Sequence, residues 1–146
     1  MLSKPEEYAE AARIAVAEGY DCVKIDPIMI DENGERAHHL NGILPSRTIR
    51  KFYERIKAVR EAVGPDVDII LELHSHPSVT GAIQLGRVWE EFNCMYFEEG
   101  VHYLNVDLQD KVTRNVRIPM AAGERIYTRW GYRPYFEKQA LDVILW

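Results

Sequence analysis

Short apolar runs and longer amphipathic stretches alternate along the whole chain. Runs such as Ile69-Ile70-Leu71 are continuously apolar, which is typical of strands that are covered on both faces of a sheet. The stretches between them place apolar residues three or four positions apart, which is typical of helices. We therefore expect helices near 5–18, 46–63, 79–92, 105–115 and 129–140, and strands near 22–26, 68–74, 94–98, 118–123 and 141–145.

Capping and breaking residues refine two of these helices. Ser3 and Glu6 have residue types and a spacing that indicate a capping box at the start of the first helix. The fifth helix is expected to be interrupted, because it contains Gly131 and Pro134. Between the first strand and the second helix, residues 28–45 form a long connection.

The regular alternation of helices and strands predicts an α/β fold with a parallel sheet and right-handed crossovers. Two architectures fit this pattern: an open, doubly wound sheet, or part of an eight-stranded (β/α)₈ barrel. The chain has neither the glycine-rich turn of dinucleotide-binding sheets nor the phosphate-binding P-loop motif, so a nucleotide-binding open sheet is less well supported. Functional residues at the ends of several consecutive strands are typical of the barrel.

Three glutamates, Glu72, Glu98 and Glu124, stand 26 residues apart, and each follows a short apolar run. A repeat of this length suits one strand and one helix, so each glutamate is expected at a strand end, on the same face of the sheet. Carboxylate oxygens are the ligands that Mg²⁺ prefers. The spacing therefore predicts three carboxylates that could hold a magnesium ion.

Further polar residues cluster at the same strand ends. Lys24 and Asp26 stand two positions apart near the end of the first expected strand, as do Glu72 and His74 in the second. Side chains two positions apart point to the same face of a strand, so each pair is expected to share a face.

These segments resemble the barrel domain of the enolase superfamily, in its mandelate racemase/muconate lactonizing enzyme-like branch. The stretches that carry the resemblance are Val23-Lys24-Ile25-Asp26-Pro27, Leu71-Glu72-Leu73-His74, Tyr96-Phe97-Glu98-Glu99 and Pro119-Met120-Ala121-Ala122-Gly123-Glu124-Arg125. The order and spacing of the three glutamates make the match specific, whereas each motif alone would be weak. It implies that the chain corresponds to about strands two to six of the TIM barrel.

The resemblance also implies a site and a chemistry. Glu72, Glu98 and Glu124 match the Mg²⁺ ligands of the family, and His74 matches the general acid of its acid-sugar dehydratases. Lys24 and Asp26 fall on the racemases' Lys-x-Lys positions, and the aspartate at the second position argues against racemase-type base chemistry. The implied reaction is abstraction of the proton next to a carboxylate, through an enediolate, followed by loss of a β-hydroxyl as water. The substrate implied is a small sugar acid resembling galactonate or gluconate.

Much of the family's pattern lies outside this sequence. We expect residues 1–146 to form a single partial barrel domain, without the capping domain and the last strands, including the strand-seven histidine that acts as base in the resembling dehydratases. The exposed sheet edges of such a domain favour association into a homo-oligomer. The alternative function is a catalytically incomplete α/β fragment that acts only as a metal-binding or self-associating module.

Several residues have plainer interpretations. A strand-end glutamate or histidine is often simply a hydrated polar residue, and Arg125 and Glu99 are expected to form ion pairs. His38-His39 are expected on the surface of the 28–45 connection. A zinc site built from His74 and His76 is less well supported, because their spacing does not give the usual helical His-Glu-x-x-His geometry.

Composition excludes some partners. The formal net charge is −5 and no basic run is present, so we expect no nucleic-acid partner. No apolar stretch approaches 18 residues and the N-terminus is polar, so we expect no membrane span or signal peptide. Cys22 and Cys94 lie far apart in strand-like segments and are expected to be buried free thiols. Free thiols are consistent with a cytoplasmic location.

Overall fold

Five parallel strands form one sheet in the computed structural model of the chain, which describes residues 2–31, 35–36 and 40–145. The strands are β1 (Cys22–Ile25), β2 (Asp68–Glu72), β3 (Tyr96–Glu98), β4 (Met120–Ala122) and β5 (Val143–Ile144). They lie side by side in chain order, β1-β2-β3-β4-β5. A doubly wound sheet reverses its strand order at a switch point, so the sequential order favours the barrel architecture.

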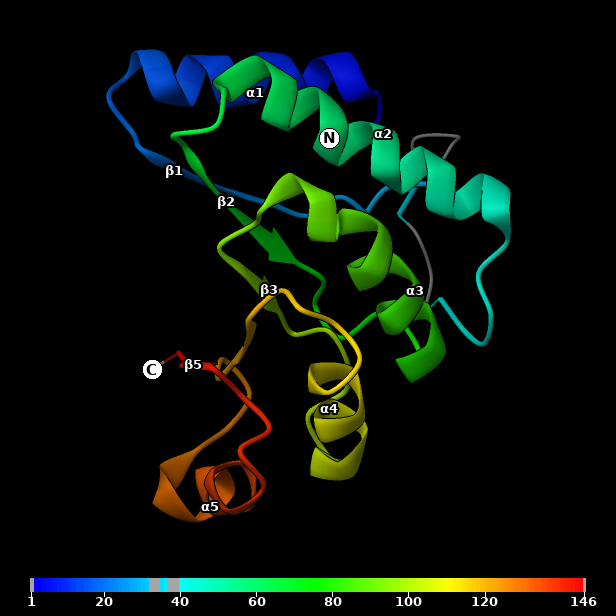
Figure 1. The fold of residues 1–146 in the computed structure, drawn as a ribbon, viewed down its shortest axis with the longest axis vertical. Helices are drawn as coiled ribbons and strands as arrows, with labels where there is room; N and C mark the ends of the chain where they lie inside the picture. Colours follow the sequence, from blue (N-terminus) through cyan, green and yellow to red (C-terminus); the bar gives the residue numbers. More distant parts are fainter. Residues whose placement is uncertain (1, 32–34, 37–39, 146) are drawn as a thin grey trace.

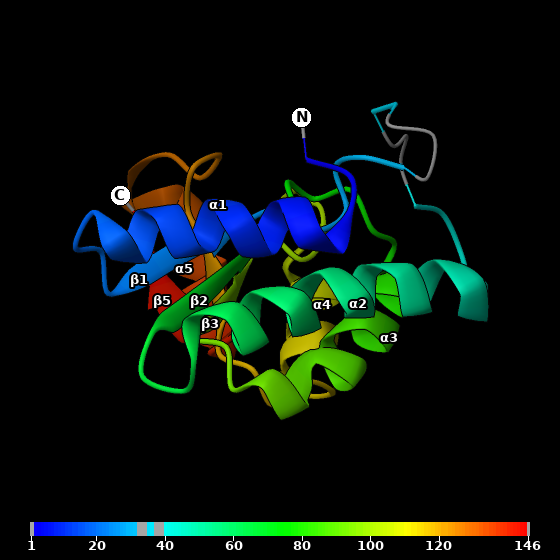
Figure 2. The same ribbon diagram turned by 90° about the horizontal axis from the view of Figure 1, so that it is seen from above.

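One helix precedes β1, and the others connect the successive strands. The helices are α1 (Pro5–Ala17), α2 (Ser46–Val63), α3 (Val79–Trp89) with the short 3₁₀ helix η1 (Glu90–Phe92), α4 (Val106–Thr113) and α5 (Thr128–Lys138). Each α-helix packs against the next one along the chain. Figures 1 and 2 show α1, α2 and α3 stacked beside the first strands. Within the described residues, no helix combines the length and apolar character that a membrane span requires.

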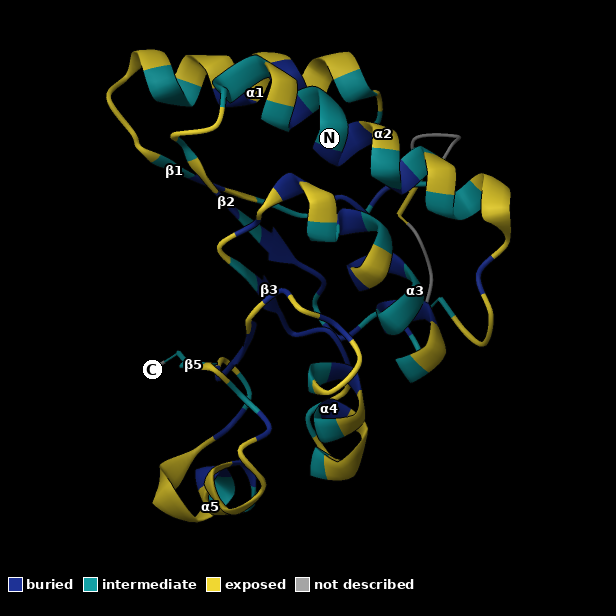
Figure 3. Ribbon diagram, in the orientation of Figure 1, coloured by how far each residue is buried: buried dark blue, intermediate teal, exposed yellow. Residues whose placement is uncertain are grey.

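The hydrophobic core lies between the sheet and these helices. Ile69 and Leu71 of β2 and Phe97 of β3 are fully buried in it, together with Trp89 of α3. The Trp89 and Phe97 rings pack edge to face, with their centroids 5.9 Å apart. Figure 3 shows the central strands as the most buried part of the ribbon. Because side chains alternate along a strand, this burial places Ile70 and Glu72 on the opposite face.

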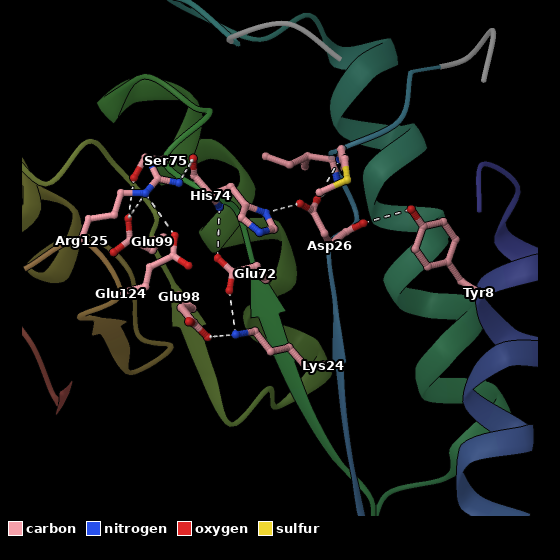
Figure 4. A network of polar contacts seen from close by, with 12 residues as sticks. Tyr8, Lys24, Asp26, Glu72, His74, Ser75, Glu98, Glu99, Glu124 and Arg125 are labelled. Carbon is pink, nitrogen blue, oxygen red and sulfur yellow. Dashed lines mark hydrogen bonds and ion pairs between the residues drawn. The ribbon is translucent and has the colours of Figure 1, made fainter. Parts of the chain in front are cut away.

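The strands are shorter than the sequence predicts. The predicted strand 68–74 ends at Glu72, because His74 and Ser75 adopt left-handed backbone angles, with φ of 50° and 59°. Backbone hydrogen bonding between β2 and β3 nevertheless continues past the strand end, since the Leu73 N–H donates to the Glu98 carbonyl at 3.1 Å. His74 still lies beside Glu72 in the same network, as Figure 4 shows, but a turn and not strand alternation places it there.

Two helix predictions also need correction. The carboxylate that caps α1 belongs to Glu7 and not Glu6, since the N–H groups of Ser3 and Lys4 donate to Glu7 at 2.7 and 3.1 Å. Helix α5 continues through Gly131 and Pro134 without the expected interruption. Tertiary contacts hold α5 in place, because the hydroxyl of its Tyr132 donates to the Leu145 carbonyl at 2.8 Å.

Gly123, directly after β4, is required for close packing. A Cβ atom at this position would lie 1.9 Å from the backbone carbonyl oxygen of Leu145. We expect Gly123→Ala to lower the free energy of unfolding by about 3 kcal/mol, because backbone must move to relieve the collision. Gly131→Ala is the control: its nearest contact is an Ile126 methyl at 3.2 Å, so urea unfolding should show a change within about 1 kcal/mol. Equal effects of the two changes would contradict the steric explanation.

The two cysteines differ in their environment. Both are free, but only Cys94 is buried as predicted, whereas Cys22 is half-buried. Burial raises the pKa of the Cys94 thiol to about 12, only partly opposed by Arg60. We expect iodoacetamide to modify Cys22 in the folded protein at pH 8 and to leave Cys94 unmodified, because thiolate is the reactive form. Raising the pH towards 9 should speed labelling of Cys22 first. Mass spectrometry of the native and urea-unfolded protein checks this, and comparable native labelling of both thiols would contradict it.

Candidate active site

A lysine bridges two buried glutamates at the ends of neighbouring strands. Lys24 Nζ lies 2.7 Å from Glu72 Oε2 and 2.6 Å from Glu98 Oε2, and Figure 4 shows it reaching both carboxylates from β1. Glu72 and Glu98 are 4% and 2% exposed, so their charges have almost no contact with solvent. Burying two carboxylates requires a compensating cation, and Lys24 supplies it.

Strand register explains this arrangement. Glu72 pairs with Glu98 across β2 and β3, so the two carboxylates start from the same level of the sheet. Lys24 pairs with Ile70, one pleat earlier, and points to the same face. Its long side chain can therefore reach forward to the level of the glutamates. The prediction that Lys24 lies among the strand-end acids is confirmed in geometry.

The shared environment shifts the pKa values of the two glutamates in opposite directions. Burial acts to raise the pKa of Glu72, but Lys24 and the His74 N–H, 3.1 Å from Glu72 Oε1, outweigh it and lower that pKa. Burial and the negative charge of Glu72 raise the pKa of Glu98 against the opposing effect of Lys24. Burial acts to lower the pKa of Lys24, but its short contacts with both carboxylates raise it overall, so the lysine stays charged.

Asp26 and His74 form a second pair beside the bridge. His74 Nδ1 lies 2.7 Å from Asp26 Oδ2, so the two predicted site residues meet although 48 residues separate them. The other carboxylate oxygen, Oδ1, accepts hydrogen bonds from the N–H groups of Ile28 and Met29, at 2.9 and 2.8 Å. An ionised carboxylate only accepts hydrogen bonds, so Nδ1 carries the proton of this contact, and Nε2 is the nitrogen left for other groups.

The loop that carries Asp26 is fixed from two helices. The Tyr8 hydroxyl of α1 donates to the Asp26 carbonyl at 3.0 Å. Fully buried Arg55 of α2 donates to the carbonyls of Pro27 and Ile30 at 2.6 and 2.7 Å. Arg55 was not predicted to support the site. A signal was present, because it occupies a buried position on the helix face that also carries Phe52.

Glu99, Ser75 and Arg125 connect the loops that follow β2, β3 and β4. Ser75 donates to Glu99 twice, from its backbone N–H to the carbonyl at 2.7 Å and from Oγ to the carboxylate at 2.6 Å. Arg125 Nε lies 3.1 Å from Glu124 and 3.9 Å from Glu99, and Nη2 donates to the His74 carbonyl at 3.2 Å. The expected ion pairs of Arg125 and Glu99 are therefore confirmed, and Figure 4 shows them next to the strand-end glutamates.

Glu124 stands apart from the other two predicted ligands. Glu98 pairs with Ala121 in β4, so Ala121 is the residue of β4 at the level of Glu72 and Glu98. Glu124 comes three positions later, after the end of that strand. Equal spacing in sequence thus does not give equal register. The Glu124 side chain is 42% exposed and contacts Arg125. Throughout the described residues, no group of three or more His, Cys, Asp or Glu side chains lies ready to hold a metal ion.

The chemistry of the site nevertheless suits a hard divalent cation at Glu72 and Glu98. The Lys24 ammonium, a cation, already lies between one oxygen of each carboxylate at short range. Its contact with Glu98 is an ion pair outside hydrogen-bond geometry, since buried Glu98 Oε2 has no hydrogen-bond partner. Such an oxygen has an unused lone pair suited to a metal ion. Two of the three predicted ligands fit Mg²⁺, and the role of Glu124 stays a prediction.

A family model described as enolase C-terminal domain-like matches residues 7–146. The chain belongs to this family. It is 30% identical over 140 residues to a D-gluconate dehydratase of Thermoproteus tenax, covering 96% of this chain and 26% of the relative. It is 31% identical over 135 residues to a D-xylonate dehydratase of Haloferax volcanii, covering 92% and 32%. The predicted enolase superfamily membership is confirmed.

A solved structure extends the comparison to three dimensions. A member of the enolase superfamily from Salmonella Typhimurium matches with a TM-score of 0.96 and 50% identity, over 99% of this chain and 37% of that chain. The α/β fold built from parallel β/α units of a TIM barrel is therefore confirmed. The chain spans about a quarter to a third of the length of these two curated relatives.

The predicted surface histidines His38-His39 lie outside the residues that the structure describes.

The Asp26 carboxylate should determine the tautomer of His74. We expect Asp26→Asn to move the ring proton from Nδ1 to Nε2, because the amide can keep its oxygen on the Ile28 and Met29 N–H groups and then presents its NH₂ to the ring. Nitrogen-15 NMR of the imidazole at pH 8 measures the tautomer directly. Asp68→Asn, at the exposed start of β2, is the control and should leave the ring signals unchanged. An unchanged His74 tautomer in Asp26→Asn would contradict this role.

Proposed function

We propose that this chain contributes half of the active site of a Mg²⁺-dependent acid-sugar dehydratase. The observation that carries the proposal is the adjacency of a His74–Asp26 pair to the buried Glu72–Lys24–Glu98 bridge at the carboxyl ends of three neighbouring strands. Family membership and the dehydratase names of two relatives support it. The substrate class is a small sugar acid with a hydroxyl group β to its carboxylate.

In this proposal His74 is the general acid. It protonates the β-hydroxyl as the group leaves as water. The proton comes from Nε2 of the imidazolium, the doubly protonated ring that Asp26 orients through Nδ1–H, and the ring is left neutral. Asp26 is thus a positioning residue for His74, and not itself an acid or base. The His74 N–H also donates to Glu72, which fixes the acid relative to the metal-ligand candidates.

Lys24 and the glutamates would bind the carboxylate end of the substrate. Glu72 and Glu98, joined by Glu124, would hold Mg²⁺. A bound Mg²⁺ would supply Lewis-acid stabilisation of the negative charge that develops on the substrate carboxylate. Lys24 provides a positive charge on the same side of the site, because its side chain reaches the carboxylate pair from β1.

The proposal assigns no base within the described residues. The second candidate function is a metal-binding or self-associating module, and it differs from the first because it catalyses no reaction. Self-association and a cytoplasmic location stay predictions for both candidates. Measurement of turnover and metal binding on the same protein separates the two functions.

We expect the chain to bind Mg²⁺ and, together with the part of the barrel that supplies the base, to convert at least one member of an acid-sugar panel to a 2-keto-3-deoxy acid. His74→Asn should then lower kcat at least about 100-fold with Mg²⁺ binding retained, since it removes only the acid. Glu98→Gln should remove Mg²⁺ binding in calorimetry. His102→Asn, on an exposed loop, is the control for loss of a histidine.

Each outcome has a distinct meaning. Mg²⁺ binding without turnover on the panel supports the metal-binding module. Absence of Mg²⁺ binding in the unmodified protein contradicts the dehydratase and the metal-binding module, and leaves only a self-associating module. Full activity in His74→Asn would contradict the role of His74 while leaving the metal site in place.

A further inference from the structure

Lys24 differs from both of its acidic partners in access to solvent. Its side chain is 47% exposed, whereas those of Glu72 and Glu98 are 6% and 3% exposed. The carboxylates are therefore held by the core, while the lysine reaches them from the open side. Lys24 can therefore leave the bridge towards solvent without disturbing the core.

We infer that Lys24 is the resident counter-ion of the Glu72–Glu98 pair and that a divalent cation displaces it. This inference rests on the proposed function, because it concerns the same metal. The ammonium contacts Oε2 of both carboxylates, and these are the same two side chains that would hold the metal ion. A metal and an ammonium repel each other at such distances and cannot occupy one position, so the two cations compete.

The charges explain the direction of the exchange. Two carboxylates and one ammonium leave a net charge of −1 at a buried site, whereas two carboxylates and a divalent cation are neutral. The cost of the exchange is the loss of two charge-assisted contacts of Lys24, which weakens metal binding. The displaced ammonium moves to the open side of the site, where it is free to pair with a substrate carboxylate. Lys24 thus holds the site together before the metal binds and serves the substrate afterwards.

Removal of Lys24 should therefore strengthen metal binding and weaken the metal-free fold. In calorimetric titrations with MgCl₂ at pH 8, we expect Lys24→Met to bind Mg²⁺ at least about tenfold more tightly than the unmodified protein. Lys24→Arg retains a counter-ion and should bind Mg²⁺ within about threefold of the unmodified protein. Lys57→Met removes a half-exposed lysine of α2 that pairs only loosely with Glu61, at 3.9 Å, and should leave the affinity unchanged.

Thermal unfolding in EDTA provides a readout that is independent of metal binding. Lys24→Met should unfold at a lower temperature than the unmodified protein, because two buried carboxylates are left without their cation. Adding Glu98→Gln to Lys24→Met should recover most of the loss, since the repulsion disappears. If Lys24→Met does not fold in EDTA, millimolar Mg²⁺ should restore the fold, and the affinity follows from that dependence.

The results separate this inference from the proposed function. Mg²⁺ binding to the unmodified protein with equal or weaker binding to Lys24→Met would overturn the counter-ion exchange and leave the metal site standing. Absence of Mg²⁺ binding in every variant would overturn both. A Lys24→Met protein that is as stable in EDTA as the unmodified protein, or that stays unfolded with Mg²⁺, would also overturn the inference.

Discussion

Two buried carboxylates share one lysine, and the rest of the strand-end architecture depends on that interaction. Glu72 and Glu98 lie at the same level of neighbouring parallel strands, where their negative charges would repel each other in a poorly hydrated environment. A core built only for stability would place apolar residues there. Two buried acids with Lys24 between them are an arrangement that is common at functional sites, which is consistent with the proposed role in binding.

The loops around this bridge are held in unusual backbone conformations. His74, Ser75 and Glu99 all have positive φ angles near 50–60°, which are uncommon for residues other than glycine. The two hydrogen bonds between Ser75 and Glu99 hold these loops together directly behind the predicted acid and ligand. Such local strain is tolerated where surrounding contacts overdetermine the structure, and it is often found at functional sites.

Much of the fold follows from the sequence, because its determinants are local or periodic. The alternation of continuous apolar runs with amphipathic stretches predicted all five strands and all five α-helices. Helix α5 differed from expectation, since it continues through Pro134 while packed in the fold by contacts such as the Tyr132 hydroxyl with the Leu145 carbonyl. The strand ends differed because a turn at His74 follows from pairing with the β3 loop, which no local pattern records.

The candidate site divides in a similar way. The sequence by itself determined which residues stand at the strand ends, because each strand and helix repeat ends its strand with a polar residue. These residues therefore recur at regular intervals along the chain. Only the tertiary structure decided which of these residues contact one another. The register between strands places Glu72 level with Glu98 and leaves Glu124 beyond that level, and it brings Lys24 and Asp26 to partners 48 residues or more away. Register arises from the packing of the whole sheet against its helices, so equal spacing in the chain does not determine it.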